Sequence, residues 1–152
     1  MNIKDITKEA ILIHEKASFK DAVRMMITQK TNTLLVVDEK GTLTGEVSVT
    51  DLLDAVVPEY LDGDSIAALF ATGDMFEEAV KDTEEKEVQF FMSRDLNTVT
   101  LEDNLMSVAA IAIEHQQVRI PVVDAENKPI GIISRQGIKH IIAKDLNIKD
   151  SV

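Results

Sequence analysis

The sequence predicts an α+β protein with α/β-type sheets, built from two similar β-α-β-β-α halves. The first observation is an internal repeat, in which a shift of 86 residues places Val36, Val37 and Asp38 on residues 122–124, which are also Val-Val-Asp. The second is helical spacing of apolar residues ahead of each β-branched run. The third is size: a half this small buries too little surface to be stable alone. We therefore expect the halves to pack sheet to sheet around a pseudo-two-fold axis.

Each half has the same order of elements. A short apolar piece (11–13, then 98–100) precedes an amphipathic helix with matching apolar positions (19, 22, 23, 26 and 27, then 105, 108, 109, 112 and 113). Ser18, and Asp103 or Asn104, are the expected N-caps of these helices. A strand, a turn and a strand follow (33–38 and 43–48, then 119–124 and 129–134), and a second amphipathic helix ends each half.

Between the halves lies an acidic segment, which divides the chain into a first repeat (1–57), a helical linker or insert (58–87) and a second repeat (88–152). Pro58 is expected to end the preceding helix. Asp64 and Ser65 are a possible cap for a short helix at 66–70, and residues 75–80 form another helical pattern. The segment either packs simply against the repeats or binds a partner.

Composition restricts the classes of function. The chain has 152 residues, 45% of them hydrophobic, a net charge of −11 and no cysteine. Disulfides and thiolate metal sites are therefore excluded, and the acidic charge argues against nucleic-acid binding. No apolar run approaches the roughly 20 residues that span a bilayer, and the N-terminus lacks a signal peptide. We expect a soluble, cytoplasmic protein with no membrane partner.

The stretch Gly-Glu-Val-Ser-Val-Thr-Asp at 45–51 has two interpretations. In one, Ser48 caps a helix and the acid three residues later completes a capping box. In the other, the helix start holds a ligand, because its N–H groups favour anions and the carboxylate of Asp51 suits two vicinal ribose hydroxyls. Both can hold together.

The whole pattern resembles the cystathionine-β-synthase (CBS) domain pair, also called a Bateman module. The resemblance is carried in the first half by Ala17-Ser18, Asp21-Ala22-Val23, Met26, 35–38, Gly41 and 45–52. In the second half it is carried by 91–93, Thr98-Val99, Leu105, 119–124 and 131–134. It covers nearly the whole chain except the middle segment, and it implies a stand-alone pair that forms a homodimer.

The resemblance implies that the glycine, two apolar residues, Ser/Thr and Asp pattern binds the ribose of an adenine nucleotide. The ribose-binding role therefore carries over to Ser48 and Asp51, which are separated by two residues, with Thr50 next to Asp51 as a neighbour of the ligand. The second half departs from the pattern, since Ser134-Arg135 is kept but Gly137 replaces the acid. Arg135 either faces phosphates or is a solvated charge at a helix start. We therefore expect one competent cleft per chain and one that is weak, altered or empty.

A second set of expected site residues lies at the strand starts. Arg119 precedes an apolar strand and suits a phosphate contact, because guanidinium offers a bidentate fork. Its alternative is an exposed strand-start charge, and its counterpart Thr33 carries none. The resemblance suggests that backbone groups around Thr33 and Val118 read the adenine edge.

Catalysis finds little support in the sequence, which has no P-loop, no Gly-x-Ser-x-Gly and no cysteine nucleophile. His14, His115 and His140 lack metal-ligand spacing, and the methionines fit core or interface positions. We expect no catalytic residue, no metal site and no required cofactor.

The first hypothesis is a regulatory sensor that binds an adenine-containing ligand (AMP, ADP, ATP or cyclic di-AMP) in the cleft between the repeats and passes its state to an unidentified protein partner. S-adenosyl and nicotinamide ligands stay open. The homodimer would form through the apolar faces of 105–113 and 138–142. The alternative is a protein-interaction adaptor with vestigial clefts, which acts through its acidic surface and the insert.

Overall fold

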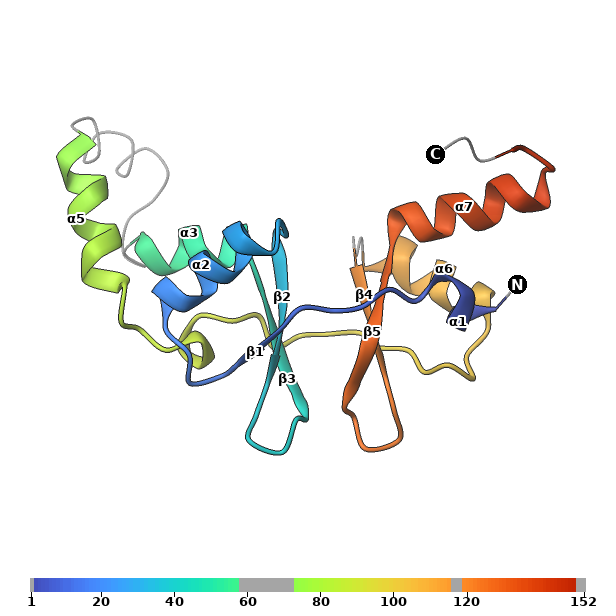
Figure 1. Cartoon of the computed structure of the whole chain (residues 1–152), viewed down its shortest axis with the longest axis horizontal. Helices are drawn as coiled ribbons and strands as arrows, with labels where there is room; N and C mark the ends of the chain where they lie inside the picture. Colours follow the sequence, from blue (N-terminus) through green and yellow to red (C-terminus); the bar gives the residue numbers. More distant parts are fainter. Residues whose placement is uncertain (1, 58–72, 116–118, 150–152) are drawn as a thin grey trace. The chain divides into compact units, whose positions relative to one another are not determined.

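The computed structural model describes residues 2–57, 73–115 and 119–149, and these divide into two compact units (Figure 1). The N-repeat unit consists of residues 11–40 and 44–95. The C-repeat unit consists of residues 1–10, 41–43 and 96–152. The N-terminal ten residues thus pack with the second repeat, and the segment that leads out of the linker packs with the first. The helix expected at 66–70, its cap at 64–65, Pro58 and Val118 lie outside the described residues.

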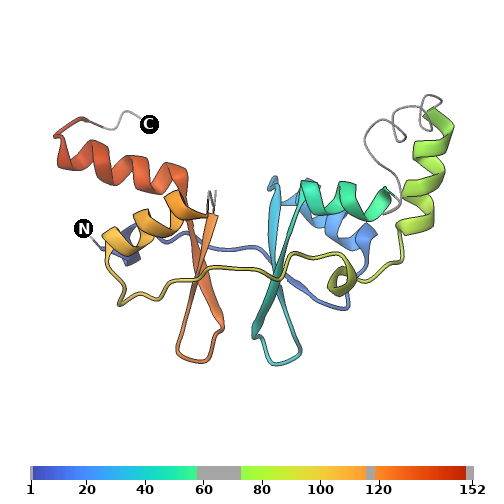
Figure 2. The same ribbon diagram turned by 180° about the vertical axis from the view of Figure 1, so that it is seen from behind.

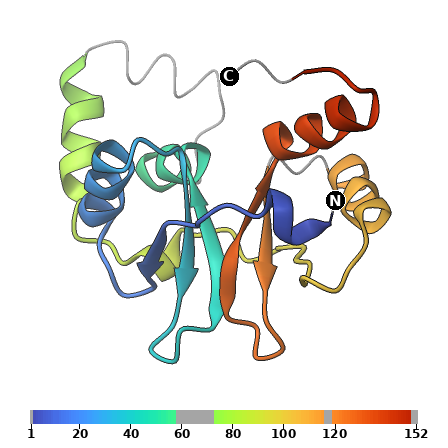
Figure 3. The ribbon, with the colours of Figure 1, turned by 45° about the vertical axis from the view of Figure 1, so that its right-hand side comes forward.

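The N-repeat unit contains a three-stranded sheet in the order β1-β2-β3. Its strands are β1 (Leu12–His14), β2 (Thr33–Val37) and β3 (Leu43–Ser48), with β1 parallel to β2. Figure 3 shows the two helices α2 (Phe19–Thr28) and α3 (Val49–Val56) next to each other beside this sheet. Apolar side chains from strands, α2 and the 3-10 helix η1 (Val88–Phe90) form one buried cluster, which includes Ile13, Ala22, Met26, Leu34, Val36, Val47, Val88 and Met92.

Two expectations about local structure in this unit are confirmed. Ser18 caps α2 in a capping box, in which its hydroxyl accepts the N–H of Asp21 and its own N–H donates to the Asp21 carboxylate. The helical pattern at 75–80 lies inside α5 (Gly73–Thr83), which contacts α3. No helix within the described ranges is long and apolar enough to cross a membrane.

The C-repeat unit pairs two antiparallel strands, β4 (Arg119–Val123) and β5 (Pro129–Ser134), with Val122 opposite Gly131. The apolar piece expected at 98–100 contributes only an isolated parallel bridge between Val99 and Val122. Three helices complete this unit (Figure 2): α1 (Ile3–Ile6), α6 (Leu105–Glu114) and α7 (Arg135–Asp145). Its core contains Ile3, Ile6, Val99, Val108, Ile120, Val122, Ile133 and Ile141. Asn104 is the N-cap of α6.

In both units a chain segment crosses the last strand at a repeat glycine. Ser93 exchanges two backbone hydrogen bonds of 2.9 Å with Glu46, next to Gly45 in β3. Lys8 exchanges two of 2.8 Å with Ile132, next to Gly131 in β5. A Cβ at either glycine would collide with the crossing segment. The repeat glycines are thus required for close backbone approach rather than for an unusual φ.

Candidate functional site

The stretch at 45–51 folds as a strand that runs directly into a helix. Ser48 ends β3 and is the N-cap of α3, with its hydroxyl accepting the Asp51 N–H at 3.3 Å. The Asp51 carboxylate accepts the Ser48 N–H at 2.8 Å through Oδ2, which closes the capping box. The same oxygen accepts the Ser48 hydroxyl at 3.1 Å. The capping interpretation is therefore confirmed, and it leaves the binding interpretation open.

Asp51 differs from an ordinary capping acid in its burial. Asp51 is only 9% exposed, whereas Asp21, the matching acid of α2, lies on the surface. A buried carboxylate needs several donors to offset its lost hydration. The additional donor is the hydroxyl of Ser93, which lies 2.7 Å from Oδ1. Sequence reasoning missed Ser93 as a site residue, because nothing in local spacing relates two positions 42 residues apart.

The other expected residues of the first half lie in the same unit. Thr50 is exposed on the first turn of α3, and Thr33 is half-buried at the start of β2. The Thr33 N–H donates to the Thr31 hydroxyl at 3.3 Å, and that hydroxyl donates to the Thr33 carbonyl at 3.1 Å. The N–H and carbonyl groups of Thr33, which were expected to bind the adenine edge, are thus hydrogen-bonded to the Thr31 hydroxyl in this structure.

A groove of about 410 Å³ lies between α2 and α3 and reaches the start of α3. Its apolar lining comes from Val23, Met26, Ile27, Val49 and Leu52, and its polar lining from Lys30, Thr31 and Asn32. This volume falls in the range of small-molecule sites. Asp51 does not line the groove, although its neighbours Val49 and Leu52 do.

The expected residues of the second half belong to the C-repeat unit. Ser134 caps α7 by accepting the Gly137 N–H at 3.3 Å, so it repeats the role of Ser48. Arg135 is exposed, and Arg119 is half-buried at the start of β4. Gly137, which stands where the acid would be, is buried, and a Cβ there would lie 3.4 Å from both Cβ and the carbonyl oxygen of Ile6. A side chain at this position would therefore be in van der Waals contact with Ile6 of α1.

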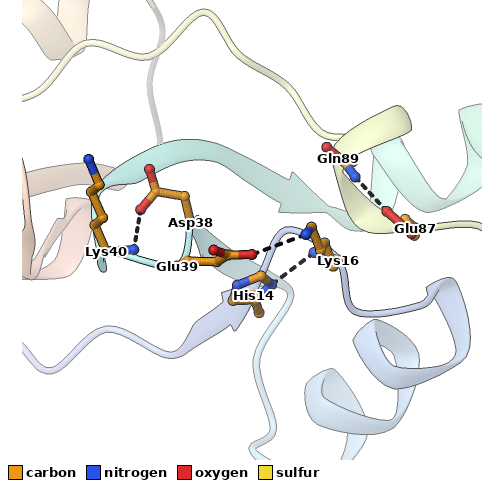
Figure 4. Close-up of polar contacts among 7 residues, drawn as sticks. All are labelled: His14, Lys16, Asp38, Glu39, Lys40, Glu87 and Gln89. Atoms are coloured by element: carbon orange, nitrogen blue, oxygen red, sulfur yellow. Dashed lines mark hydrogen bonds and ion pairs between the residues drawn. The ribbon is translucent and has the colours of Figure 1, made fainter.

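Figure 4 shows a second polar cluster in the N-repeat unit, at the end of β1. His14 Nδ1 accepts the Lys16 N–H at 3.0 Å, and Lys16 Nζ forms an ion pair with Glu39 at 3.0 Å. The hydrogen bond and charge of Glu39 raise the pKa of Lys16 above its ordinary value. In the described ranges no three His, Asp or Glu side chains are grouped as a metal site. The cluster is thus one exposed ion pair, Lys16 with Glu39, beside a turn that His14 holds through a backbone hydrogen bond.

Several known proteins are similar to this chain in sequence or in structure. The protein MJ1426 of Methanocaldococcus jannaschii is 27% identical over 146 residues, which cover 89% of this chain and 87% of that protein. The chloroplastic protein CBSX2 of Arabidopsis thaliana is 28% identical, over 84% of this chain and 56% of that protein. A crystal structure of CBSX2 in complex with AMP has a TM-score of 0.71 and 26% identity, covering 95% of this chain and 98% of that one.

A further structure, the CBS domain pair of MJ0100 with 5-methylthioadenosine and S-adenosyl-L-methionine, has a TM-score of 0.68 at 23% identity, covering 95% of this chain and 98% of that one. It supports the fold alone. The model of the CBS domain family matches residues 3–58 and again residues 86–144, once for each repeat. These two matches cover most of the chain and coincide with the repeat found by the 86-residue shift, so the chain belongs to the CBS domain family as a pair of CBS domains.

Proposed function

We propose that the chain is a regulatory module, without catalysis of its own, that binds an adenine-containing nucleotide through Asp51 and passes the bound state to a partner protein. The observation that carries the proposal is the Asp51 carboxylate, which is nearly buried, fixed by donors at both oxygens and placed at the start of α3. A buried carboxylate with spare acceptor capacity suits ribose hydroxyls. Ser48 and Thr50, on the same turn, are the proposed neighbours of the ligand.

Support for the ligand class comes from relatives. CBSX2 has been solved in complex with AMP, and the chain in that structure is 26% identical to this one. AMP is therefore the first nucleotide to test, ahead of ADP, ATP, cyclic di-AMP and S-adenosylmethionine. Arg119 and Arg135 stay proposed phosphate contacts, and with them Thr33, Val118 and Ser134 stay proposed site residues. If the two arginines contact the phosphate, Arg119→Ala and Arg135→Ala should weaken the binding of AMP more than the binding of adenosine, which has no phosphate.

The test is a thermal-shift panel on wild type, Asp51→Ala and a matched control, Asp21→Ala. The control removes the same N3 capping acid, from α2 instead of α3, and because Asp51 also loses its contact with Ser93, each ligand shift is measured against the same variant without ligand. Ligand at about 100 times its dissociation constant adds about 2.7 kcal/mol, which is several degrees for a chain of this size. We expect the shift in wild type and Asp21→Ala and its loss in Asp51→Ala.

A response that survives in Asp51→Ala would contradict the proposed site. A flat panel with all three proteins folded would contradict the nucleotide sensor. It would direct the search to a partner of the adaptor class, through pull-downs with variants in residues 58–87. A response lost in both variants would show that capping energy, and not the carboxylate of Asp51, decides binding.

We further propose a homodimer through the apolar helix faces. Met106 and Ile113 on α6 are each 79% exposed, and Ile142 on α7 is 55% exposed. Exposed apolar side chains grouped on helices are typical of interfaces. Ile113→Lys is expected to shift sedimentation from dimer to monomer, whereas Ile130→Lys, a change at an exposed apolar residue on β5, leaves the dimer intact. A monomeric wild type would refute this proposal.

A further inference from the structure

The acceptor capacity of Asp51 is mostly used within the protein. A carboxylate offers about four acceptor positions, two on each oxygen. Oδ2 accepts the Ser48 N–H at 2.8 Å and the Ser48 hydroxyl at 3.1 Å, so both of its positions are taken. Oδ1 accepts only the Ser93 hydroxyl at 2.7 Å among the described contacts. The remaining position is therefore on Oδ1, beside Ser93.

The backbone of Ser93, an exposed residue, is held in place by hydrogen bonds to β3. The Ser93 N–H donates to the Glu46 carbonyl, and the Glu46 N–H donates to the Ser93 carbonyl, each at 2.9 Å. The preceding residue, Met92, is 8% exposed and packs in the core of the N-repeat unit. The backbone of Ser93 therefore has little conformational freedom to lose when its hydroxyl holds Asp51, which favours preorganisation.

From this geometry we propose that Ser93 is a positioning residue for Asp51, which fixes the carboxylate so that Oδ1 accepts a ribose hydroxyl of the ligand. The inference rests on the proposed function. Ser93 itself does not touch the ligand in this arrangement. Without its hydroxyl the carboxylate is held only through Oδ2, on the side of the helix cap, and Oδ1 loses its fixed direction.

The second half lacks both members of this pair. Gly137 stands in place of Asp51, and Lys8 rather than a hydroxyl residue forms the backbone bridge to the last strand. Lys8 bonds Ile132, which matches Glu46 under the 86-residue shift. The bridging residue thus carries a hydroxyl where the acid is present and none where the acid is missing, and the nearby hydroxyl of Thr7 donates to the Ile3 carbonyl at 2.7 Å instead. This is the pattern expected if the hydroxyl serves the acid rather than the strand crossing.

Calorimetric titration of AMP and of 2′,3′-dideoxy-AMP into wild type, Ser93→Ala and Ser93→Thr tests the role. Without the Ser93 hydroxyl only part of the protein holds Oδ1 in the binding direction, and if that part is about a tenth, Ser93→Ala weakens AMP binding about tenfold. Ser93→Thr keeps the hydroxyl and should restore affinity to within about twofold of wild type. The dideoxy analogue lacks the ribose hydroxyls, so its affinity should not change. A merely structural role would weaken both ligands equally.

A measurement without ligand checks the contact itself. Ser93→Ala should lower the melting temperature more in wild type than in an Asp51→Ala background, because the hydrogen bond exists only when both residues are present. Equal losses in the two backgrounds would overturn the inference. So would a wild type that binds AMP while Ser93→Ala weakens AMP and its dideoxy analogue alike, with the proposed function left standing. A wild type that binds neither AMP nor any other member of the panel would refute the proposed function and, with it, the role of Ser93.

Discussion

Replacing Gly131 with alanine tests how the N-terminal segment is held to the second repeat. An added Cβ would collide with the carbonyl oxygen of Lys8 and lie 2.6 Å from Cγ2 of Thr7. Such a contact is too short to be relieved by rotating a side chain, because the first obstacle is backbone. The crossing segment must therefore move away from β5, and the two hydrogen bonds of 2.8 Å between Lys8 and Ile132 are broken or stretched.

The structure sets the size of the effect. Two backbone hydrogen bonds at about 1 kcal/mol each give a loss of about 2 kcal/mol. If the whole segment leaves, Ile3 and Ile6, which are 0% and 6% exposed, lose their burial as well. Burial of one such side chain is worth about 1.5–3 kcal/mol, which adds about 3–6 kcal/mol. We therefore expect Gly131→Ala to lower the free energy of unfolding by at least about 2 kcal/mol, a melting shift of about 4–8 °C.

Urea denaturation followed by far-ultraviolet circular dichroism measures this loss. The comparison variant is Gly45→Ala, where the two nearest atoms belong to the flexible side chain of Met92 and backbone is met at 2.9 Å, at the Ser93 carbonyl. We expect a smaller loss there. Adding Ile3→Ala to Gly131→Ala shows whether the segment has detached, since the second change then has little further effect. A Gly131→Ala protein within about 0.5 kcal/mol of wild type would refute the close approach of Lys8.

Three further outcomes are expected. Hydrogen bonds from the backbone and hydroxyl of Ser18 hold the pKa of Asp21 below its ordinary value of 3.8. The ionised carboxylate therefore stabilises the fold fully above pH 3.8, and this stabilisation is lost as the pH falls through the lower pKa of the folded state. The difference in melting temperature between wild type and Asp21→Asn should be constant from about pH 5 to 7 and should shrink in more acidic buffer. Asn104→Ala removes the cap of α6 and should cost about 1 kcal/mol in chemical denaturation, while no measurable loss would argue against the cap. Glu39→Gln breaks an exposed ion pair with Lys16 and should change stability by less than about 1 kcal/mol, with the difference vanishing at high salt.

Local rules were enough to predict the repeat and its helix starts. The caps at Ser18 and Ser48 depend on residues three positions apart, so spacing alone identifies them. The hairpins likewise follow from β-branched runs around short turns. The 3.6-residue period identifies the helix residues of the core, Ala22, Met26, Val108 and Ile141, although Ile27 and Ile113, which share the same spacing, are exposed.

Long-range pairing of irregular segments was not predictable in the same way. The segments that contain Ser93 and Lys8 show no hydrophobic periodicity that would predict their bridges to β3 and β5. Under the 86-residue shift Ser93 matches Thr7 rather than Lys8. The crossing segments therefore differ in register by one residue between the units. A shift of one residue changes which side chain meets the helix start, so the contact from Ser93 to Asp51 could be seen only in three dimensions.

The helix start of the second half is packed differently from that of the first. Ile6, from the segment bonded to β5, lies against Gly137, with its Cβ 3.4 Å from the place of a Cβ. An aspartate at this position would have its Cβ in contact with the buried Ile6, and the residue that bridges to β5 is Lys8, which has no hydroxyl. Burying a charge without donors costs several kcal/mol, so apolar packing of α1 disfavours an acid at this helix start. Glycine at 137 thus fits the packing of the N-terminal segment, and a ligand bound at this helix start would have no acid at position 137 to hold it.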